Sequence, residues 1–554
     1  MDHHRAASSL LLLLLLAHLS LSCLLAGFPA AATARATEAS SRAHLRAALD
    51  AAARGVEQAL TTMSATASAP ASLGDGDDDP FSTPLAAAAR EDCEELLEEA
   101  LALLAGASAP GATRADALTW LSAALTNHDT CADGLTESGV VVSGTTSHAT
   151  RHHHHHHAHI AAARAAVRDS LAMYYASSAT TGTASEAAGC GCKNVTKREG
   201  TCGGFPRWLP ARDRRLLLLS TLAETADFVV AKDGTGTHAT IAGAVKAAPE
   251  CSERRTVLYV KAGRYDENVK VGMKKTNLVF VGDGKGITVV AGTRCVAGSN
   301  YTTFRTATFA ASGFGFMMRD MTVENAAGPA GHQAVALRVS ADRAVVHRCA
   351  IAGYQDTLYA HSNRQFFRDC DVYGTVDVVF GNAAAVLQRC TLWSRAPLPG
   401  QKNTVTAQDR NAPCQLTGIV LHACRLLPAP DLAAAPSPSL MAAPEKKGTP
   451  TYTYLGRPWR PYSRVVVMMS YIGAHVAPRG WLEWNASAYA LDTLYYGEYR
   501  NSGPGAGVAG RVAWPGHRVI TSDAEAESFT VAQFIAGASW LPATGVSFVA
   551  GLEL

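Results

Sequence analysis

Residues 353–382, which read GYQDTLYAHSNRQFFRDCDVYGTVDVVFGN, carry the pattern that decides the fold of most of the chain. An apolar phrase recurs through and around this stretch: MMRDMTV from Met317, VVHRCAI from Val345, FFRDCDV from Phe366 and VLQRCTL from Val386. In the last three copies the central cysteine recurs after 21 and then 20 residues. A repeat of about 20 residues with one short strand per copy is typical of a parallel β-solenoid. We therefore expect an all-β, parallel β-helix domain here.

Two aspartates in this stretch, Asp356 and Asp377, stand 21 residues apart, each seven residues after a repeat cysteine. Residues one coil apart in such a stack lie on neighbouring strands, about 4.8 Å from each other. The spacing therefore predicts that the two carboxylates lie side by side. Gln333 and Gln355 follow the same interval, being 22 residues apart, so we expect two amide groups on the same face.

Two carboxylates beside two amides suit more than one kind of chemistry. Paired carboxylates in a groove usually divide their labour, because one stays ionised beside a cation while the other, crowded by a like charge, keeps its proton. Glutamine amides can donate to an oxyanion without adding charge. The set therefore suits acyl transfer with an aspartate nucleophile. It equally suits glycoside hydrolysis, in which two carboxylates stand about 5 Å apart in retaining enzymes. A ladder of aspartates that only satisfies turns is the third interpretation.

The composition and the N-terminus indicate a secreted protein. The chain has 554 residues, is 17% charged and carries a net charge of +2, which gives no strong field for binding nucleic acid. Residues 1–34 combine a basic start, an apolar run from Leu10 and small residues, the order of a secretory signal peptide. A retained membrane anchor is the alternative. Thirteen cysteines and three sequons, at Asn194, Asn300 and Asn485, agree with the secretory route.

Residues 40–180 predict a separate all-α domain. Apolar residues between Cys93 and Leu104 follow the i, i+3, i+4, i+7 pattern. Weaker helices are expected at 42–62, at 115–127 with an end near Cys131, and at 159–175. Four amphipathic helices favour an antiparallel four-helix bundle, in which Cys93 and Cys131 would bridge the second and third helices. The run His152–His157 does not preset a coordination geometry, so we expect a low-complexity loop and no metal site.

The segments that join and interrupt these domains have their own composition. Residues 181–225 form a linker that contains the basic sequence RDRR at 212–215. Exposed basic pairs in a linker suit processing proteases of the secretory pathway, and a solvated charge run is the alternative. Residues 428–450 are rich in Pro and Ala and predict a surface insertion. In the repeat, Cys370 and Cys390 occupy matching sites on adjacent coils, which favours them as a disulfide pair.

Several motifs, in order, resemble those of the plant pectin methylesterases. They are GRYDENV (263–269), HQAVALRV (332–339), GYQDTLYAHSNRQFFRDC, GTVDVVFGNA, LGRPW (455–459) and DTLYYGEYRNSGPGA, and together they span nearly all of residues 226–554. TWLSAALTNHDTCADGL (119–135) is similar to the pectin methylesterase inhibitor domain, and FPRWLPARDRRLL is similar to that family's processing linker. The resemblance implies a pro-enzyme in which an inhibitor-like four-helix bundle precedes a right-handed parallel β-helix.

The resemblance also assigns a role to each residue that matches the family's motifs. It implies a nucleophile at Asp377, a proton donor at Asp356, oxyanion stabilisation by Gln355, substrate contacts by Thr303, Gln333, Arg457 and Trp459, and a second role for Arg457 in holding Asp377 ionised. The implied reaction removes methyl esters from homogalacturonan and releases methanol, without a metal or an organic cofactor. The resemblance also implies a monomer that is secreted to the cell wall (apoplast). Its expected partners are this polymer and pectin methylesterase inhibitor proteins, and no nucleic acid.

The chain departs from the family pattern at three places. The inhibitor family's early cysteine pair is absent between Cys23 and Cys93, which predicts a looser first hairpin. Val378 stands where phenylalanine is usual, and Asp409 stands where the family has glycine, so an added carboxylate would discourage polygalacturonate if it faces the groove. Two other functions stay open: a β-helical glycosidase or lyase acting on the same polymer, and a non-catalytic wall-binding or inhibitory protein.

Overall fold

The computed structural model describes residues 30–67, 81–140, 151–177, 225–434, 452–485 and 488–553. By contacts the chain divides into two compact units, residues 1–48 and residues 49–554. The predicted signal segment before residue 30, the sequon at Asn194 and the basic sequence at 212–215 lie outside the described residues. Within the described ranges, no helix combines the length and the apolar character needed to cross a membrane.

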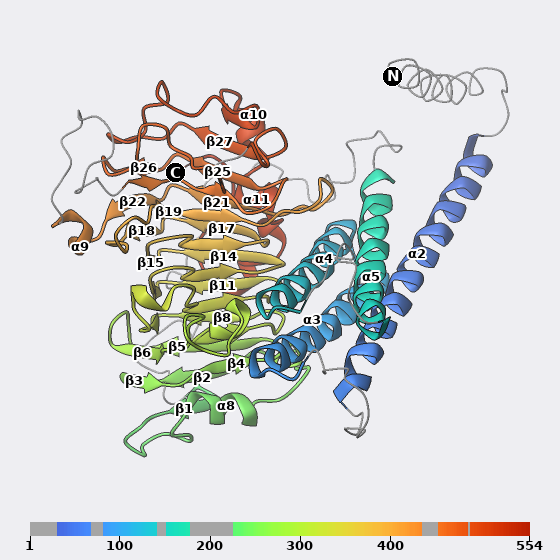
Figure 1. Cartoon of the computed structure of the whole chain (residues 1–554), viewed down its shortest axis with the longest axis horizontal. Coiled ribbons are helices and arrows are strands. Elements are labelled where there is room, and N and C mark those ends of the chain that lie inside the picture. Colours follow the sequence, from blue (N-terminus) through green and yellow to red (C-terminus); the bar gives the residue numbers. More distant parts are fainter. Residues whose placement is uncertain are drawn as a thin grey trace, which may run out of the picture. The chain divides into compact units, whose positions relative to one another are not determined.

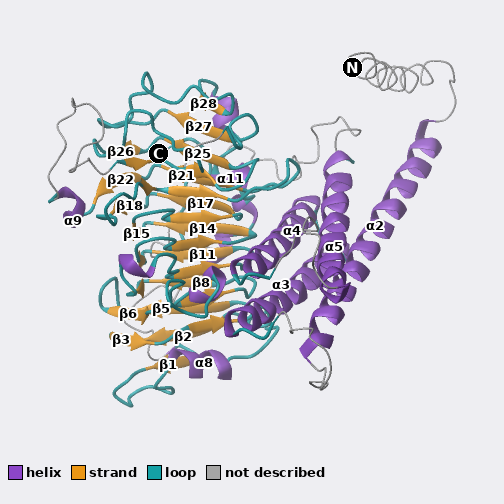
Figure 2. Cartoon of the chain, in the orientation of Figure 1, coloured by secondary structure: helices purple, strands orange, loops and turns teal. Residues whose placement is uncertain are grey.

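The described residues from 226 onward form a parallel β-helix, and their strands stack in three long sheets (Figures 1 and 2). The first sheet contains β1 (Phe228–Val230), β2 (Thr256–Val260), β5 (Leu278–Gly282), β8 (Met317–Arg319), β11 (Ala344–His347), β14 (Arg364–Arg368), β17 (Ala384–Gln388), β21 (Gly418–His422), β25 (Arg464–Met468), β27 (Tyr495–Tyr499) and β28 (His517–Val519). The second contains β4 (Val269–Val271), β7 (Phe309–Ala311), β10 (Leu337–Val339), β13 (Leu358–Ala360), β16 (Val379–Gly381), β20 (Thr406–Gln408) and β24 (Arg457–Pro458). The third contains β3 (Gly263–Asp266), β6 (Thr288–Gly292), β9 (Thr322–Asn325), β12 (Ala350–Ala352), β15 (Asp371–Gly374), β18 (Thr391–Ser394), β22 (Arg425–Pro428) and β26 (Tyr471–Ile472). A short pair, β19 (Asn403–Thr404) and β23 (Thr453–Tyr454), lies beside them.

The repeated phrases fall in register, as the sequence predicts. Met317 pairs with Val345, Val345 with Phe366, and Phe366 with Val386. The predicted fold class is confirmed. Because adjacent apolar residues on a strand point to opposite faces, each phrase buries both sides of the first sheet. Phe367 belongs to the core inside the coils, whereas Phe366 belongs to a second core on the outer face of the sheet.

The C-terminal segment covers that outer face. It carries the short helices α10 (Asp523–Glu527) and α11 (Val531–Phe534), and its side chains Phe529, Val531 and Trp540 pack into the outer core. Two further helices, α8 (Ile241–Ala247) and α9 (Pro430–Ala433), lie at the start of the β-helix and after β22. α9 lies within the predicted surface insertion (428–450), of which residues 435–450 are outside the described residues.

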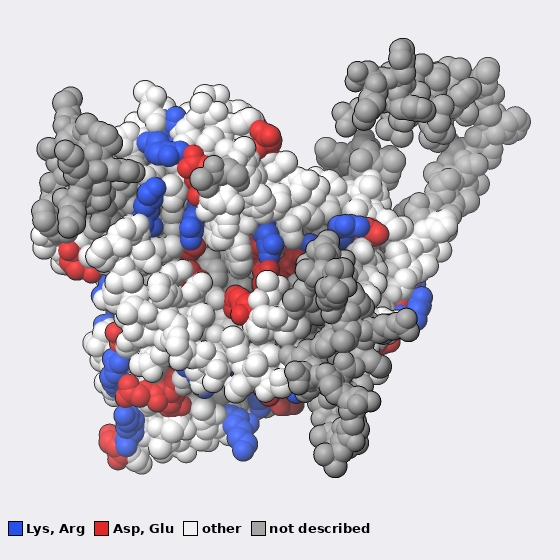
Figure 3. All heavy atoms as spheres, in the orientation of Figure 1, with Lys and Arg blue, Asp and Glu red and all other residues white. Residues whose placement is uncertain are grey.

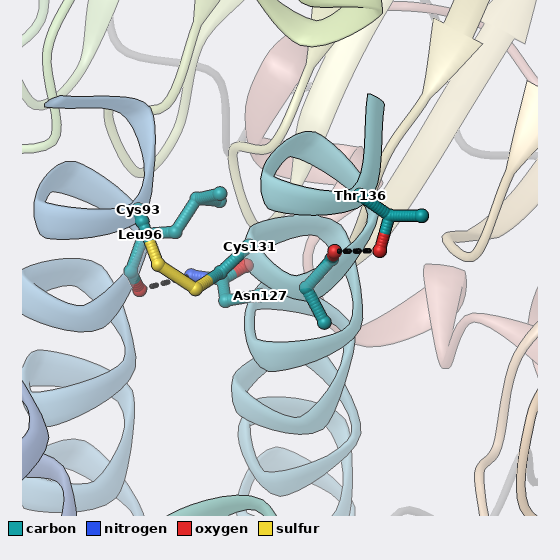
Figure 4. The surroundings of a disulfide bond; sticks show 6 residues. Cys93, Leu96, Asn127, Cys131 and Thr136 are labelled. Atoms are coloured by element: carbon teal, nitrogen blue, oxygen red, sulfur yellow. Dashed lines mark hydrogen bonds between the residues drawn. A yellow bond between two sulfur atoms is a disulfide. The ribbon is translucent and has the colours of Figure 1, made fainter. Parts of the chain in front are cut away.

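The N-terminal part is helical, with α2 (Ala30–Ala67), α3 (Pro84–Ser108), α4 (Arg114–Glu137) and α5 (Arg151–Ala176). Thr83 caps α3, and Thr113 closes a capping box with Asp116 at the start of α4, so both boundaries follow from the sequence. The predicted bridge is confirmed: Cys93 and Cys131 form a disulfide between α3 and α4, with their Cα atoms 4.5 Å apart (Figure 4). Beside it, the Asn127 amide donates to the carbonyl of Leu96 at 3.0 Å.

Three expectations need correction. α4 continues to Glu137, past the predicted end near Cys131, because its later residues are buried by tertiary packing that periodicity does not report. The backbone of His152–His157 belongs to α5 and not to a loop. Cys370 and Cys390 are both free and buried. Equivalent sites on neighbouring parallel strands are about 4.8 Å apart, which exceeds the Cβ separation of about 3.8 Å that a disulfide needs.

Candidate active site

All seven residues that the sequence singles out line one pocket on the outer side of the second sheet. They are Thr303, Gln333, Gln355, Asp356, Asp377, Arg457 and Trp459. The stacking of coils explains how residues more than 150 positions apart meet. Gln333 forms a parallel bridge with Gln355, and the pairing of Leu358 with Val379 continues the 21-residue register that relates Asp356 to Asp377. The predicted adjacency of these side chains is therefore present in the structure.

The two aspartates occupy the turns that lead into β13 and β16. Both have left-handed backbone, with φ of 61° at Asp356 and 53° at Asp377, a conformation that costs non-glycine residues of order 1 kcal/mol or more and often occurs at functional sites. Both are buried, at 7% and 5% exposure. Burial, and then repulsion from Asp377, raises the pKa of Asp356 well above its usual range. One carboxyl of the pair therefore keeps a proton that an exposed aspartate would lose.

Arg457 makes the environment of Asp377 different from that of Asp356. Its Nε donates to Asp377 Oδ1 at 2.8 Å, and its Nη2 donates to Oδ2 at 2.6 Å. Such a bidentate pair combines charge with fixed geometry and favours the ionised carboxylate. The two carboxyls therefore differ, because a guanidinium holds Asp377 while Asp356 has a raised pKa, and paired carboxylates that divide their labour need such a difference.

Aromatic side chains form one wall of the pocket. Tyr359 stacks on Phe380 with ring centroids 4.2 Å apart, Phe380 lies 6.1 Å from Trp459, and Trp459 lies 6.4 Å from Trp484. The guanidinium carbon of Arg457 also lies over the Trp484 ring, 4.4 Å from the centroid of that ring. Stacked aromatic faces next to polar groups suit a sugar chain.

Trp484 was not among the predicted site residues. The sequence Gly480–Trp484 (GWLEW) shows that the segment is rich in aromatics, but not which indole faces the pocket. The structure places Trp481 in the core inside the coils, fully buried, and Trp484 in the pocket wall.

The last turns of α4 also line the pocket, through Thr130, Asp133, Gly134 and Glu137. The Glu137 carboxylate accepts hydrogen bonds from the backbone N–H of Thr303 at 2.9 Å and from its hydroxyl at 3.1 Å. Thr303 is a residue to which the resemblance gives a substrate contact. A carboxylate from the helical part therefore occupies the two hydrogen-bond donors of this residue.

The two departures from the family pattern in the β-helix are accounted for. Val378 points into the core inside the coils, away from the pocket. Asp409 is 1% exposed and is not among the residues that line the pocket. Its carboxylate accepts a hydrogen bond from Arg460 Nε at 3.0 Å, and the Nη2 of the same arginine donates to Asp133 of α4. Asp409 is therefore the ion-pair partner of Arg460, which also links it to α4.

Comparison with known proteins agrees with this geometry. A family model described as pectinesterase matches residues 227–538. The chain belongs to the pectinesterase family. A second model, plant invertase/pectin methylesterase inhibitor, matches residues 23–173, which contain the disulfide-linked helices α3 and α4. This pectinesterase therefore carries an inhibitor-type region ahead of its β-helix.

Curated relatives match most of this chain. The probable pectinesterase/pectinesterase inhibitor 34 of Arabidopsis thaliana is 53% identical over 481 residues, which are 85% of this chain and 75% of that protein. Pectinesterase 2.1 of Solanum lycopersicum is 46% identical over 467 residues, 83% of this chain and 78% of that one. The solved pectin methylesterase from carrot is 51% identical with a TM-score of 0.55, and it covers 59% of this chain and 98% of its own. A pectinesterase β-helix thus exists there as a folded protein without a helical region of this length.

Proposed function

We propose that this chain hydrolyses the methyl esters of cell-wall homogalacturonan to free galacturonate and methanol, as a carboxylic ester hydrolase with an aspartate nucleophile. The observation that carries the proposal is the asymmetric pair itself. Asp377 is held by the bidentate Arg457, and its neighbour Asp356 has a raised pKa. Family membership supplies the substrate class, and the aromatic wall of the pocket agrees with a sugar polymer.

The first step is acylation. Asp377 attacks the C6 carbonyl of a methylated galacturonate, and the amides of Gln333 and Gln355 donate to the oxyanion. Asp356 gives its proton to the departing methoxide, so that methanol leaves. In the second step Asp356, now ionised, takes a proton from the water that attacks the acyl-enzyme, and Asp377 is released. Thr303, Arg457 and Trp459 bind the polymer. The route needs no metal or organic cofactor.

Measuring methanol release from esterified pectin tests this function. We expect Asp377→Asn and Asp356→Asn each to lower turnover by at least about 100-fold, because one removes the nucleophile and the other the proton shuttle. Asp371→Asn, on the third sheet and paired with Lys285, is the matched control. Near-normal turnover by Asp377→Asn contradicts the nucleophile assignment. New reducing ends or unsaturated products without methanol would instead identify a glycosidase or a lyase.

We infer further that the helical region inhibits the enzyme in cis by filling the groove. Glu137 and Asp133 of α4 reach the pocket and bind Thr303 and Arg460. The core of the helical region is continuous with Phe304, Tyr359 and Phe380 on the groove side of the β-helix. Polymer cannot contact these residues while α4 covers them.

Comparing the full chain with residues 226–554 alone tests this second inference. We propose the domain boundaries 1–34 (signal), 40–180 (inhibitor-like bundle), 181–225 (linker with the basic processing sequence) and 226–554 (β-helix). The isolated segment should release methanol faster than the full chain. Equal rates contradict inhibition in cis, and inactivity of both would favour a non-catalytic wall-binding protein.

We also propose that the protein is a secreted monomer of the cell wall. The asparagine side chains at Asn300 and Asn485 are exposed, as glycosylation would require. On the face drawn in Figure 3, the described acidic and basic side chains are interspersed, which does not favour nucleic acid as a partner. Recovery of the glycosylated chain from an apoplastic wash, and its mass by light scattering, test the location and the oligomeric state.

A further inference from the structure

Thr404 makes four hydrogen bonds to the turn that carries Asp377. Its backbone N–H donates to the carbonyl of Thr375 at 3.1 Å, and its carbonyl accepts from the N–H of Val378 at 3.0 Å. Its hydroxyl oxygen accepts from the backbone N–H of Asp377 at 2.8 Å and donates to Asp377 Oδ1 at 2.7 Å. The residue lies in β19, one coil beyond the nucleophile, and is fully buried.

The direction of the last two bonds is fixed by chemistry. A backbone N–H can only donate and an ionised carboxylate can only accept, so the hydroxyl must accept from the first and donate to the second. Together they close a small ring through the backbone and the side chain of Asp377. Such a ring fixes the side-chain torsions of the aspartate, whose backbone is already in the left-handed region at φ 53°.

The two oxygens of Asp377 consequently have different numbers of donors. Oδ1 accepts from the Thr404 hydroxyl and from Arg457 Nε, so both of its lone-pair positions are occupied. Oδ2 accepts from Arg457 Nη2 at 2.6 Å and has no second protein donor among the hydrogen bonds of the described residues. One lone pair of Oδ2 is therefore available for a new bond.

We propose that Thr404 is a positioning residue that makes Oδ2 the attacking oxygen of Asp377. This inference rests on the proposed role of Asp377 as nucleophile. During acylation the Oδ2–C6 bond forms and the C6–OCH₃ bond breaks, with the proton of Asp356 going to the methoxide. Oδ1 becomes the carbonyl oxygen of the acyl-enzyme and keeps both donors. Water then forms the new C–O bond at C6, Oδ2 leaves, and Asp356 takes the proton of the water.

Thr404 has no place in substrate binding, because it does not line the pocket and its side chain is buried behind Asp377. Its loss should therefore affect the chemical step and not the affinity for polymer. A residue that only supported the fold would change the thermal stability, or both kinetic constants together. This difference separates a positioning role from a structural one.

The decisive variants are Thr404→Val, which keeps the β-branched shape without the hydroxyl, and Thr404→Ser, which keeps the hydroxyl. Residues 226–554 are suitable for the assay because the carrot enzyme shows that such a β-helix folds by itself, and the full chain is assayed in parallel. Thr406→Val is the matched control. Thr406 is equally buried two residues away, and its hydroxyl donates to the carbonyl of Leu455 at 2.8 Å.

We expect Thr404→Val to lower kcat about 10- to 100-fold, the effect of removing one hydrogen bond to a charged group, with KM within about twofold. The burst of methanol, which reports acylation, should slow by the same factor. Thr404→Ser should restore kcat to within about threefold of wild type. Thr404→Ala replaces the valine variant if the latter does not fold.

Three results would overturn the inference: kcat of Thr404→Val within about threefold of wild type, a loss seen mainly in KM, or a serine variant as slow as the valine one. Asp377→Asn is measured beside these variants. If that variant stays active, the nucleophile assignment fails. If it is inactive while Thr404→Val is normal, only the positioning role fails.

Discussion

The substitution Asp116→Asn should release the helical region from the β-helix. Asp116 Oδ1 accepts from Arg364 Nη2 at 2.6 Å and from Arg343 Nη2 at 3.0 Å, and both arginines belong to the β-helix. The side chains of Asp116 and Arg364 are 8% and 4% exposed, so this ion pair is shielded from solvent. Asparagine keeps nearly the same shape and an acceptor for the capping box with Thr113, but it removes the charge.

The magnitude follows from the burial. Removing one partner of a buried ion pair costs about 3–5 kcal/mol. Arg364 keeps a second partner, because its Nη2 also donates to Asp342 at 2.6 Å, and Arg343 is one-third exposed. We therefore expect a loss of about 2–3 kcal/mol in docking free energy, which raises the ratio of undocked to docked molecules about 30- to 140-fold.

The pH dependence of this contact has a definite sign. Burial alone would raise the pKa of Asp116, but hydrogen bonds from Thr113 and Arg364 outweigh it and lower the pKa to about 2. A depressed pKa means that the stabilisation is present above the ordinary value of 3.8 and is lost as the pH falls toward 2. The comparison of wild type and Asp116→Asn therefore belongs near neutral pH.

The assay is methanol release by the full chain, with residues 226–554 as the upper limit. Asp116→Asn should bring the full chain closer to that limit. Asp169→Asn on α5, whose side chain is 65% exposed, is the control for an equal loss of charge in the helical region. The reasoning is refuted if the isolated segment is several-fold faster than the wild-type full chain, yet Asp116→Asn gains nothing.

Three further predictions concern the disulfide, the proton donor and the aromatic wall. Cys93→Ser removes a disulfide between residues 38 positions apart, so the free energy of unfolding of the helical region should fall by about 3–4 kcal/mol. In calorimetry the helical region should unfold at a lower temperature while the β-helix transition stays in place. A single unchanged transition contradicts this prediction. Burial and Asp377 raise the pKa of Asp356. The rate of acylation should therefore stay high far above pH 4 and fall only as the pH passes that raised pKa. A fall of the burst rate centred near pH 4 would exclude Asp356 as the acid. Trp484→Ala should lower kcat/KM on pectin about tenfold, whereas Trp393→Ala, stacked on Tyr373 in the third sheet, should not.

Much of the β-helix follows from local spacing, and the structure shows why. The phrases from Val345, Phe366 and Val386 pair residue for residue, so the interval between them is the register of the stack. The pairing of Gln333 with Gln355 follows from the same interval. The disulfide Cys93–Cys131 could also be predicted, because Cys93 lies on the helix with the clearest apolar periodicity and Cys131 lies near the predicted end of the next helix.

The features that residue spacing could not predict are those that depend on contacts between distant segments. The extension of α4 to Glu137 depends on burial against the β-helix, which helix periodicity does not contain. The ion pair between Asp409 and Arg460 could not be predicted, because the sequence shows only an added charge and not which residue lies beside it. Thr404 had no signal at all. A threonine in a short β segment becomes meaningful only when the next coil brings it to the turn of Asp377.

The roles of the two aspartates also depend on a distant residue. A 21-residue interval is symmetric, because it places Asp356 and Asp377 together without distinguishing them. The asymmetry comes from the rung that Arg457 occupies. In the second sheet Tyr359 pairs with Phe380, Phe380 with Ala407, and Ala407 with Arg457. Asp377 precedes the strand of Phe380, two rungs from the arginine, whereas Asp356 precedes the strand of Tyr359, three rungs away. A guanidinium that spans two rungs binds the nearer carboxylate and leaves the farther one beside a negative charge. The proposed order of acid and nucleophile thus follows from the direction in which the coils are stacked.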